Sequence, residues 1–200
     1  MSPRPGANFR RPSGSLAFTR WHSTLAVRIF PTIFAPRYCV KVKSVAKTDS
    51  NADAADRESL HERVLNASRE HVVHAFREPE HFAQWWGPMG FRSTIHSFDF
   101  RQGGRLELTL HGPDGADYEN EYVVEEFVEP ERIVISHPDP GHFFQLFITL
   151  AEEGQDETRL TWRQRFDTRE HFERVKSFVA EANEQNLDRL ETELGRFRKP

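Results

Sequence analysis

Six short runs in which apolar and polar residues alternate follow one another between Thr94 and Phe166. Alternation with a period of two is typical of strands that bury one face. The runs are separated by short turns, such as Gly103-Gly104 and Gly112-Pro113-Asp114-Gly115, and short turns join antiparallel neighbours. This region is therefore predicted to form an antiparallel meander of six strands.

A long helix is predicted after the meander. The apolar residues from Phe172 to Leu194 recur at spacings of three, four or five. Asp167 and Glu170 have the spacing of a capping box, and Gly195 is predicted to end the helix. About 27 helical residues would measure about 40 Å, which is long enough to cross the whole sheet.

One strand and two short helices are predicted before the meander. Residues 60–67 are predicted to be a strand, Ser68 is a typical N-cap for a helix that ends near Arg77, and Pro79 suits the first turn of a second helix. We therefore predict an α+β fold in which a curled seven-stranded antiparallel sheet surrounds the long C-terminal helix. The domain is expected to span residues 57–195, with a tail at 196–200.

The N-terminal segment differs from the rest of the chain in charge. Residues 1–48 contain nine basic residues and no acidic residue, whereas the remainder carries 18 basic and 31 acidic residues, a net charge of −13. Residues 1–56 are predicted to be a basic extension and linker: either disordered, or translated from a misplaced start codon, or an organelle transit peptide. A cytoplasmic location is expected, or an organelle matrix if the transit peptide is real.

The composition excludes several classes of protein. An acidic domain repels phosphate backbones, so no nucleic-acid partner is expected for it. Cys39 is the single cysteine, which excludes an intrachain disulfide and a cysteine-rich zinc site. No apolar run approaches the roughly 18 residues that would suggest a membrane span. Homodimerisation stays open.

An aromatic-lined pocket is predicted inside the curled sheet, because strand alternation places many aromatic residues and a few polar ones on the inner face. Apolar walls with sparse polar groups are typical of small-molecule sites, although each aromatic residue taken alone is more commonly ordinary core. The predicted ligand-binding residues are Trp85, Trp86, His96, Phe98, Tyr118, Asn120, Tyr122, Phe144, Trp162, Gln164 and Phe178.

No catalytic motif is present, so an enzyme is not the favoured interpretation. His96 is the only catalytic candidate, because alternation would place it beside Phe98 and Phe100, where it could act as a general acid or base in a cyclase or dehydratase. A buried histidine bonded to a neighbouring residue is the alternative interpretation. His71 and His74 are three apart on a helix, but a metal site needs three or four ligands, so neither a metal nor a cofactor is expected.

The order strand, two helices, six strands and long helix resembles the START-like helix-grip superfamily of polyketide cyclases and pollen allergens. Residues 58–194 are most similar to the family named for the C-terminal domain of the heat-shock-protein-90 ATPase activator. The matching motifs are residues 75–88 (AFREPEHFAQWWGP), 98–104 (FDFRQGG), 112–115 (GPDG) and 129–133 (EPERI).

The resemblance implies a domain that binds a hydrophobic small molecule in an internal cavity. A cyclase or dehydratase that uses the same cavity is the alternative, and a stress-related co-chaperone is a third interpretation. The eukaryotic activators carry a separate large N-terminal domain that does much of the chaperone binding. The first fifty residues here are too short and too proline-rich to replace that domain, so a chaperone partner is not expected.

Overall fold

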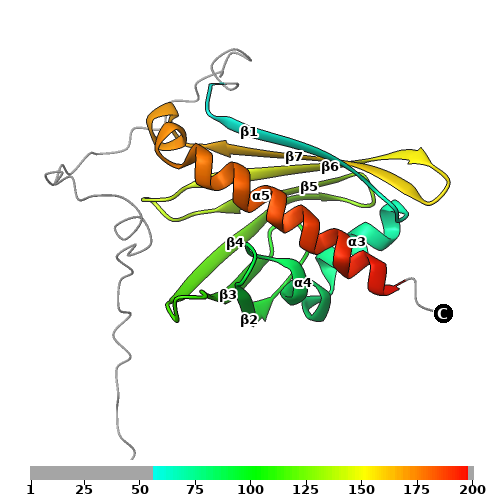
Figure 1. Cartoon of the computed structure of the whole chain (residues 1–200), viewed down its shortest axis with the longest axis horizontal. Coiled ribbons are helices and arrows are strands. Elements are labelled where there is room, and N and C mark those ends of the chain that lie inside the picture. Colours follow the sequence, from blue (N-terminus) through cyan, green and yellow to red (C-terminus); the bar gives the residue numbers. More distant parts are fainter. Residues whose placement is uncertain (1–55, 198–200) are drawn as a thin grey trace, which may run out of the picture. The chain divides into compact units, whose positions relative to one another are not determined.

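The computed structural model describes residues 56–197 (Figure 1). The predictions for the basic extension, among them the transit peptide and the misplaced start codon, fall outside the described residues except for Asp56. In chain order the elements are β1 Glu58–Leu65, α3 Arg69–Arg77, α4 Pro79–Trp85, β2 Arg92–Phe98, β3 Arg105–His111, β4 Asp117–Val128, β5 Arg132–His137, β6 Phe144–Gly154, β7 Glu157–Phe166 and α5 Arg169–Phe197.

The seven strands form one sheet in the order β1-β7-β6-β5-β4-β3-β2, and every neighbouring pair is antiparallel. The meander from β2 to β7 keeps the chain order, while β1 pairs with the last strand. The predicted α+β class, the number of strands and the long C-terminal helix are therefore confirmed.

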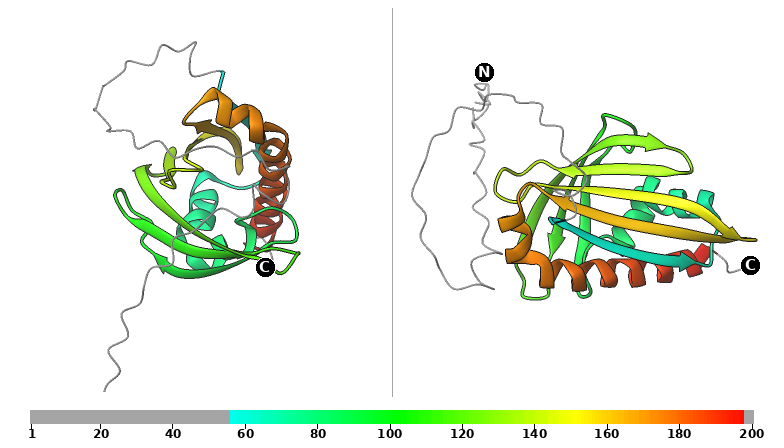
Figure 2. Two further views of the ribbon diagram at one scale, coloured as in Figure 1. Left: turned by 90° about the vertical axis from the view of Figure 1, so that its left-hand side faces the viewer. Right: turned by 90° about the horizontal axis from the view of Figure 1, so that it is seen from above.

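All three helices lie on the concave side of the sheet. Figure 2 shows the sheet curving around them, with α5 lying along the concave face. α5 packs against β1 and β7 and against both short helices, and α4 also packs against β2. The core between these layers is formed by apolar residues of the concave face together with the inward stripe of α5, which includes Leu187, Leu190 and Leu194.

The short helices begin where the sequence predicts. Ser68 caps α3, because its Oγ accepts a hydrogen bond from the backbone N–H of His71 at 3.4 Å. Pro79 is the first residue of α4. β1 begins two residues earlier than predicted and ends at Leu65, because Ala67 already belongs to the connection, where its carbonyl accepts from Thr158 Oγ1 at 2.7 Å.

The ends of α5 correct two predictions. Thr168 occupies the cap position, since its Oγ1 accepts from the N–H of His171 at 3.0 Å, and Asp167 lies outside the helix. Gly195 does not end the helix, which continues to Phe197. Gly195 does not have the positive φ that a glycine stop adopts, so it continues the helical path. No helix of residues 56–197 is long and apolar enough to cross a membrane.

Candidate functional site

Four aromatic side chains pack together where α4 meets the concave face. They are Phe82 and Trp85 of α4, Trp86 directly after it, and Trp162 of β7, and we call them the tryptophan cluster. The Trp86 ring lies 4.6 Å from Phe82, 5.4 Å from Trp85 and 6.0 Å from Trp162, measured between centroids. All four residues are buried. The predicted inner position of Trp85, Trp86 and Trp162 is therefore correct, and in this region they fill space against one another.

A second group lies where β5, β6 and β7 end beside the start of α5. Cross-strand pairing places His137 opposite Phe144 and Phe144 opposite Phe166, so these three side chains form one row on the concave face. Phe166 in turn contacts His171 in the first turn of α5, with 5.1 Å between ring centroids. The whole group, which we call the histidine–aromatic cluster, consists of Tyr122, His137, His142, Phe144, Phe166 and His171.

His142 and Tyr122 complete this cluster. The His142 ring, from the loop between β5 and β6, lies 5.8 Å from His137 and 5.3 Å from His171. The Tyr122 ring lies 5.2 Å from His137 and 5.4 Å from Trp86. Tyr122 therefore joins the histidine–aromatic cluster to the tryptophan cluster.

Two of the histidine rings are fixed by hydrogen bonds at one nitrogen. His137 Nδ1 donates to the backbone carbonyl of Glu121 at 2.8 Å, and His171 Nδ1 donates to Asp167 Oδ1 at 2.8 Å. Both residues are buried. With Nδ1 engaged, Nε2 is the ring atom that remains to face a neighbour or a bound molecule.

Burial favours the uncharged forms of three members of this cluster, His137, His142 and Tyr122. Burial, followed by the neighbouring His137 and His171, lowers the pKa of His142 to about 4. Burial also lowers the pKa of His137 and raises the pKa of Tyr122 to about 12. Between those limits His142 and Tyr122 are neutral, so the surroundings favour a neutral, apolar molecule over an ion.

Three amide side chains supply polarity near the cluster. Gln164 of β7 and Asn183 of α5 are both buried, and Asn183 Nδ2 donates to Gln164 Oε1 at 2.9 Å. On β4, the Tyr122 hydroxyl donates to Asn120 Oδ1 at 3.2 Å. Asn120 Nδ2 donates to the carbonyl of Tyr118 at 2.9 Å. The inward-facing amides are thus each held by a partner, which fixes their orientation.

Burial of inward-facing residues decreases towards this end of the concave face. On β4, Val124 and Tyr122 are buried, whereas Asn120 is only half-buried on the same face. On α5, Val175 follows His171 by one turn and precedes Val179 by another, yet it is half-buried while both of its neighbours are buried. Phe144 is half-buried as well. The inward-facing side chains at this end of the concave face are therefore less completely covered than those in the core.

His96 lies on the other side of the sheet, so the prediction that it faces inward with Phe98 is wrong. The pairing of β2 with β3 shifts between Ile95 and Ser97, which makes His96 the extra residue of a β-bulge. His96 is exposed, and its Nε2 is hydrogen-bonded at 2.7 Å to Thr109 Oγ1, whose side chain points to the outer face. It cannot act as a base in a cavity on the concave face.

The other predicted residues divide into three places. Phe98 packs in the core 5.3 Å from Phe82, and Tyr118 lies near the β3–β4 turn, where its hydroxyl donates to Asp114 Oδ2 at 3.3 Å. Phe178 is 42% exposed at the edge of the α5 stripe. The predicted residues that meet at the two joined clusters are Trp85, Trp86, Tyr122, Phe144, Trp162 and Gln164, with Asn120 bonded to Tyr122.

Three functional candidates are absent from the predicted set: His137, His142 and His171. For His137 a signal exists, because Ile133, Ile135 and His137 alternate along one strand face. His171 stands four residues after Asp167, which is a helical spacing. His142 follows the Pro138 to Gly141 turn, where no periodicity indicates its direction. Among residues 56–197, no group of three or more potential ligands is arranged to hold a metal ion.

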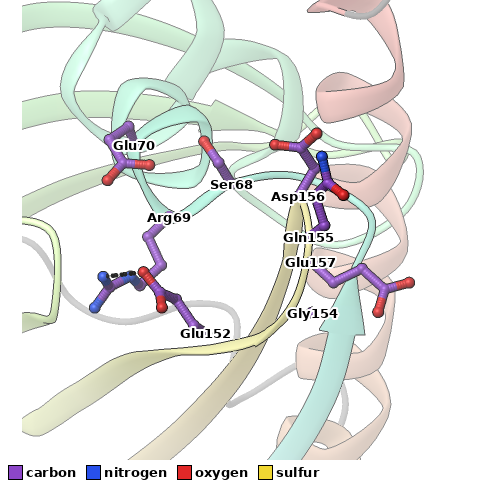
Figure 3. A pocket seen from close by; sticks show the side chains of 8 residues that line it. All are labelled: Ser68, Arg69, Glu70, Glu152, Gly154, Gln155, Asp156 and Glu157. Carbon is purple, nitrogen blue, oxygen red and sulfur yellow. Dashed lines mark hydrogen bonds and ion pairs between the residues drawn. The ribbon is translucent and has the colours of Figure 1, made fainter.

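A polar hollow of about 300 Å³ lies elsewhere, between the start of α3 and the β6–β7 hairpin (Figure 3). Arg69 Nη2 donates to Glu152 Oε1 across it at 2.6 Å. The lining residues are Ser68, Arg69, Glu70, Glu152, Gly154, Gln155, Asp156 and Glu157. This hollow contains no aromatic residue and none of the predicted site residues, and its ion pair ties α3 to the hairpin.

Solved structures share the fold. A protein from Nitrosomonas europaea is 18% identical over 72% of this chain and 97% of its own, with a TM-score of 0.65. A protein from Chromobacterium violaceum is 25% identical over 68% of this chain and 95% of its own, with a TM-score of 0.58. The AHSA1 protein from Silicibacter pomeroyi is 20% identical over 70% of this chain and 99% of its own, with a TM-score of 0.58.

A comparison with curated proteins found no match. The family described as "Activator of Hsp90 ATPase homolog 1-like protein" matches residues 66–195, which extend from the end of β1 to the last turns of α5. That match covers more than half of the chain and includes both clusters. The chain therefore belongs to the Activator of Hsp90 ATPase homolog 1-like family, as the sequence motifs predict.

Proposed function

We propose that this domain binds a small, neutral, apolar or aromatic molecule at the histidine–aromatic cluster, between the concave face and the N-terminal half of α5. The observation that carries the proposal is the incomplete cover at that end. Val175 and Phe144 face inward yet stay half-buried, although they adjoin buried residues. Apolar side chains that face one another and remain accessible gain free energy when a ligand covers them.

The chemistry of the cluster supports a neutral ligand. His142 has a pKa of about 4 and Tyr122 a pKa of about 12, so neither carries charge at neutral pH. An ionic ligand would lose its hydration without gaining a counter-charge from these groups. A ring or an alkyl chain, in contrast, would gain contact with Phe144, Phe166 and the exposed edge provided by Phe178.

The enzymatic alternative predicted from the sequence depended on His96 as the catalytic residue. His96 lies on the outer face of the sheet, away from the concave face. Binding without turnover is therefore the function that we propose. His137 and His142 serve in this proposal as neutral walls of the site, because burial lowers their pKa values.

The proposal is tested with the full chain and the uncharged fluorescent probe N-phenyl-1-naphthylamine. Saturable binding with a rise in probe fluorescence is expected. Val175→Trp would fill the uncovered space above the cluster, so we expect it to weaken probe binding at least about tenfold. Lys176→Trp is the matched control. Lys176 is the exposed neighbour of Val175, so this substitution adds the same ring on the outer side of α5.

Equal loss of binding in the two variants would show that the probe binds elsewhere, and an absence of saturable binding to the wild type would refute the proposal. Circular dichroism at the temperature of the binding titration verifies that both variants are folded. Native mass spectrometry of gently purified protein would then identify the class of any small molecule that co-purifies.

A further inference from the structure

Trp162 lies on the concave face of β7, the strand between the edge strand β1 and β6. It is 2% exposed and pairs across the sheet with Ile148 of β6 and His61 of β1. Its ring lies 6.4 Å from Trp85 and 6.0 Å from Trp86. The side chain is thus held by both neighbouring strands and by the tryptophan cluster.

The indole N–H of Trp162 has no acceptor among residues 56–197, and it is the one buried side-chain nitrogen or oxygen of those residues for which this holds. Trp85 provides the contrast, because its Nε1 donates to the carbonyl of Ala75 at 2.9 Å. A buried donor without an acceptor destabilises the folded state, and native proteins rarely keep one without a reason.

The polar side chains closest to Trp162 along the sheet are engaged elsewhere. His61 bonds through Nε2 to Ser59 Oγ at 2.8 Å and through Nδ1 to Glu184. Gln164, two residues further on the same face of β7, accepts from Asn183 at 2.9 Å. Because a buried water needs two to four polar partners, this mostly apolar neighbourhood is a poor place to hold one.

Trp162 is also connected to the site proposed above. Trp86 contacts Trp162 on one side and Tyr122, a member of the histidine–aromatic cluster, on the other, at 6.0 Å and 5.4 Å between ring centroids. A flat molecule that enters over Phe144 and displaces the edge of Trp86 would come within one ring of the indole N–H. The innermost atoms of that molecule would then meet a donor without an acceptor.

We propose that Trp162 Nε1 donates a hydrogen bond to an acceptor oxygen of the bound molecule, which makes the ligand class a neutral aromatic or alicyclic compound with a carbonyl or ether oxygen. This inference rests on the proposed function. The indole N–H is a donor only and carries no charge, so it selects an acceptor without requiring an anion. A ligand that lacks such an oxygen leaves the donor unmatched, which lowers its affinity.

The test uses indane and 1-indanone, two probes with the same carbon skeleton that differ in one carbonyl group. Full-length wild type and Trp162→Phe are titrated with each probe by ¹⁵N-edited NMR. We expect Trp162→Phe to weaken 1-indanone binding by about two- to tenfold, the size of one neutral hydrogen bond, and to leave indane binding unchanged. Comparing the two probes cancels any effect of the substitution on packing.

The wild type alone gives a second readout that does not depend on the variant. The indole N–H resonance of Trp162, assigned by its disappearance in Trp162→Phe or by triple-resonance spectra, should move downfield with 1-indanone and stay nearly constant with indane. An equal effect of Trp162→Phe on both probes, or no difference in the indole shift, overturns the inference while binding itself stands. If neither indane nor 1-indanone binds, the inference is overturned, and the result counts against the proposed function as well.

Discussion

Acid should destabilise this domain through His142 in a narrow pH window. The folded-state pKa of His142 is about 4 and its ordinary value is 6.5, so the unfolded chain binds the proton first as pH falls. The contribution of His142 to the free energy of unfolding is full above about pH 6.5 and is lost progressively as the pH falls to about 4. From these two values, lowering the pH from 7 to 5 costs about 2 kcal/mol through this one side chain.

The groups that face His142 are His137 of β5, His171 of α5 and the carboxylates of Asp139 and Asp167. Burial and the two histidines lower its pKa, and the two carboxylates raise it. In His142→Gln the titrating group is removed while these neighbours remain. Their own contribution to the pH dependence is therefore present in both proteins and cancels in the comparison.

The assay is urea unfolding of the full chain, followed by tryptophan fluorescence at pH 7 and pH 5. Wild type is expected to lose about 2 kcal/mol more free energy of unfolding than His142→Gln between these two pH values. If both proteins lose the same amount of free energy of unfolding, the lowered pKa of His142 is refuted, and with it the neutral state of this side chain at pH 5.

Two further predictions concern how α5 is held. Arg189 donates to the carbonyls of Gly87 at 2.5 Å and Gln84 at 2.7 Å, so Arg189→Met should lower the free energy of unfolding in urea by about 2 kcal/mol. An unchanged free energy of unfolding would refute this role of Arg189. Thr168→Ala removes the cap from the N–H of His171 and should cost about 1 kcal/mol, whereas Thr168→Ser should restore most of it.

The order of strands within the meander and the inward side of α5 follow from local patterns, and those patterns are strong in this chain. The turn residues between Gly103 and Gly141 leave little freedom in how successive strands connect, and the apolar stripe up to Leu194 fixes the inward side of the helix. Gly103 has φ +78°, and at Gly104 a Cβ atom would come within 2.0 Å of the Asp99 carbonyl, so this turn requires glycine.

The error at His96 has a different origin. Alternation assigns a face correctly only while each residue of one strand opposes one residue of the next. The bulge in β2 adds one residue and turns His96 outward, although Phe98 returns to the concave face opposite Leu106. No local sequence pattern around His96 indicates the bulge, because the bulge depends on the register between β2 and β3.

The residues of the histidine–aromatic cluster are far apart in the sequence, so local patterns do not predict that they lie together in the fold. Tyr122 and His171 belong to one contact network through His137 and His142, yet they come from β4 and α5. Period-two spacing could have placed His137 beside Ile135, but the direction of His142 is decided by how its loop folds back on α5. That information is tertiary, and no single-segment pattern contains it.

The side chains that burial keeps neutral are consistent with the uncharged ligand that we propose for this acidic domain. The excess carboxylates lie mainly on exposed positions, where several are paired with arginine, as Glu121 is with Arg105 and Glu126 is with Arg132. The concave face instead holds groups that burial keeps uncharged, such as Tyr122 and His142. The proposed preference for an uncharged molecule therefore depends on these buried neutral groups and not on the net charge of the domain.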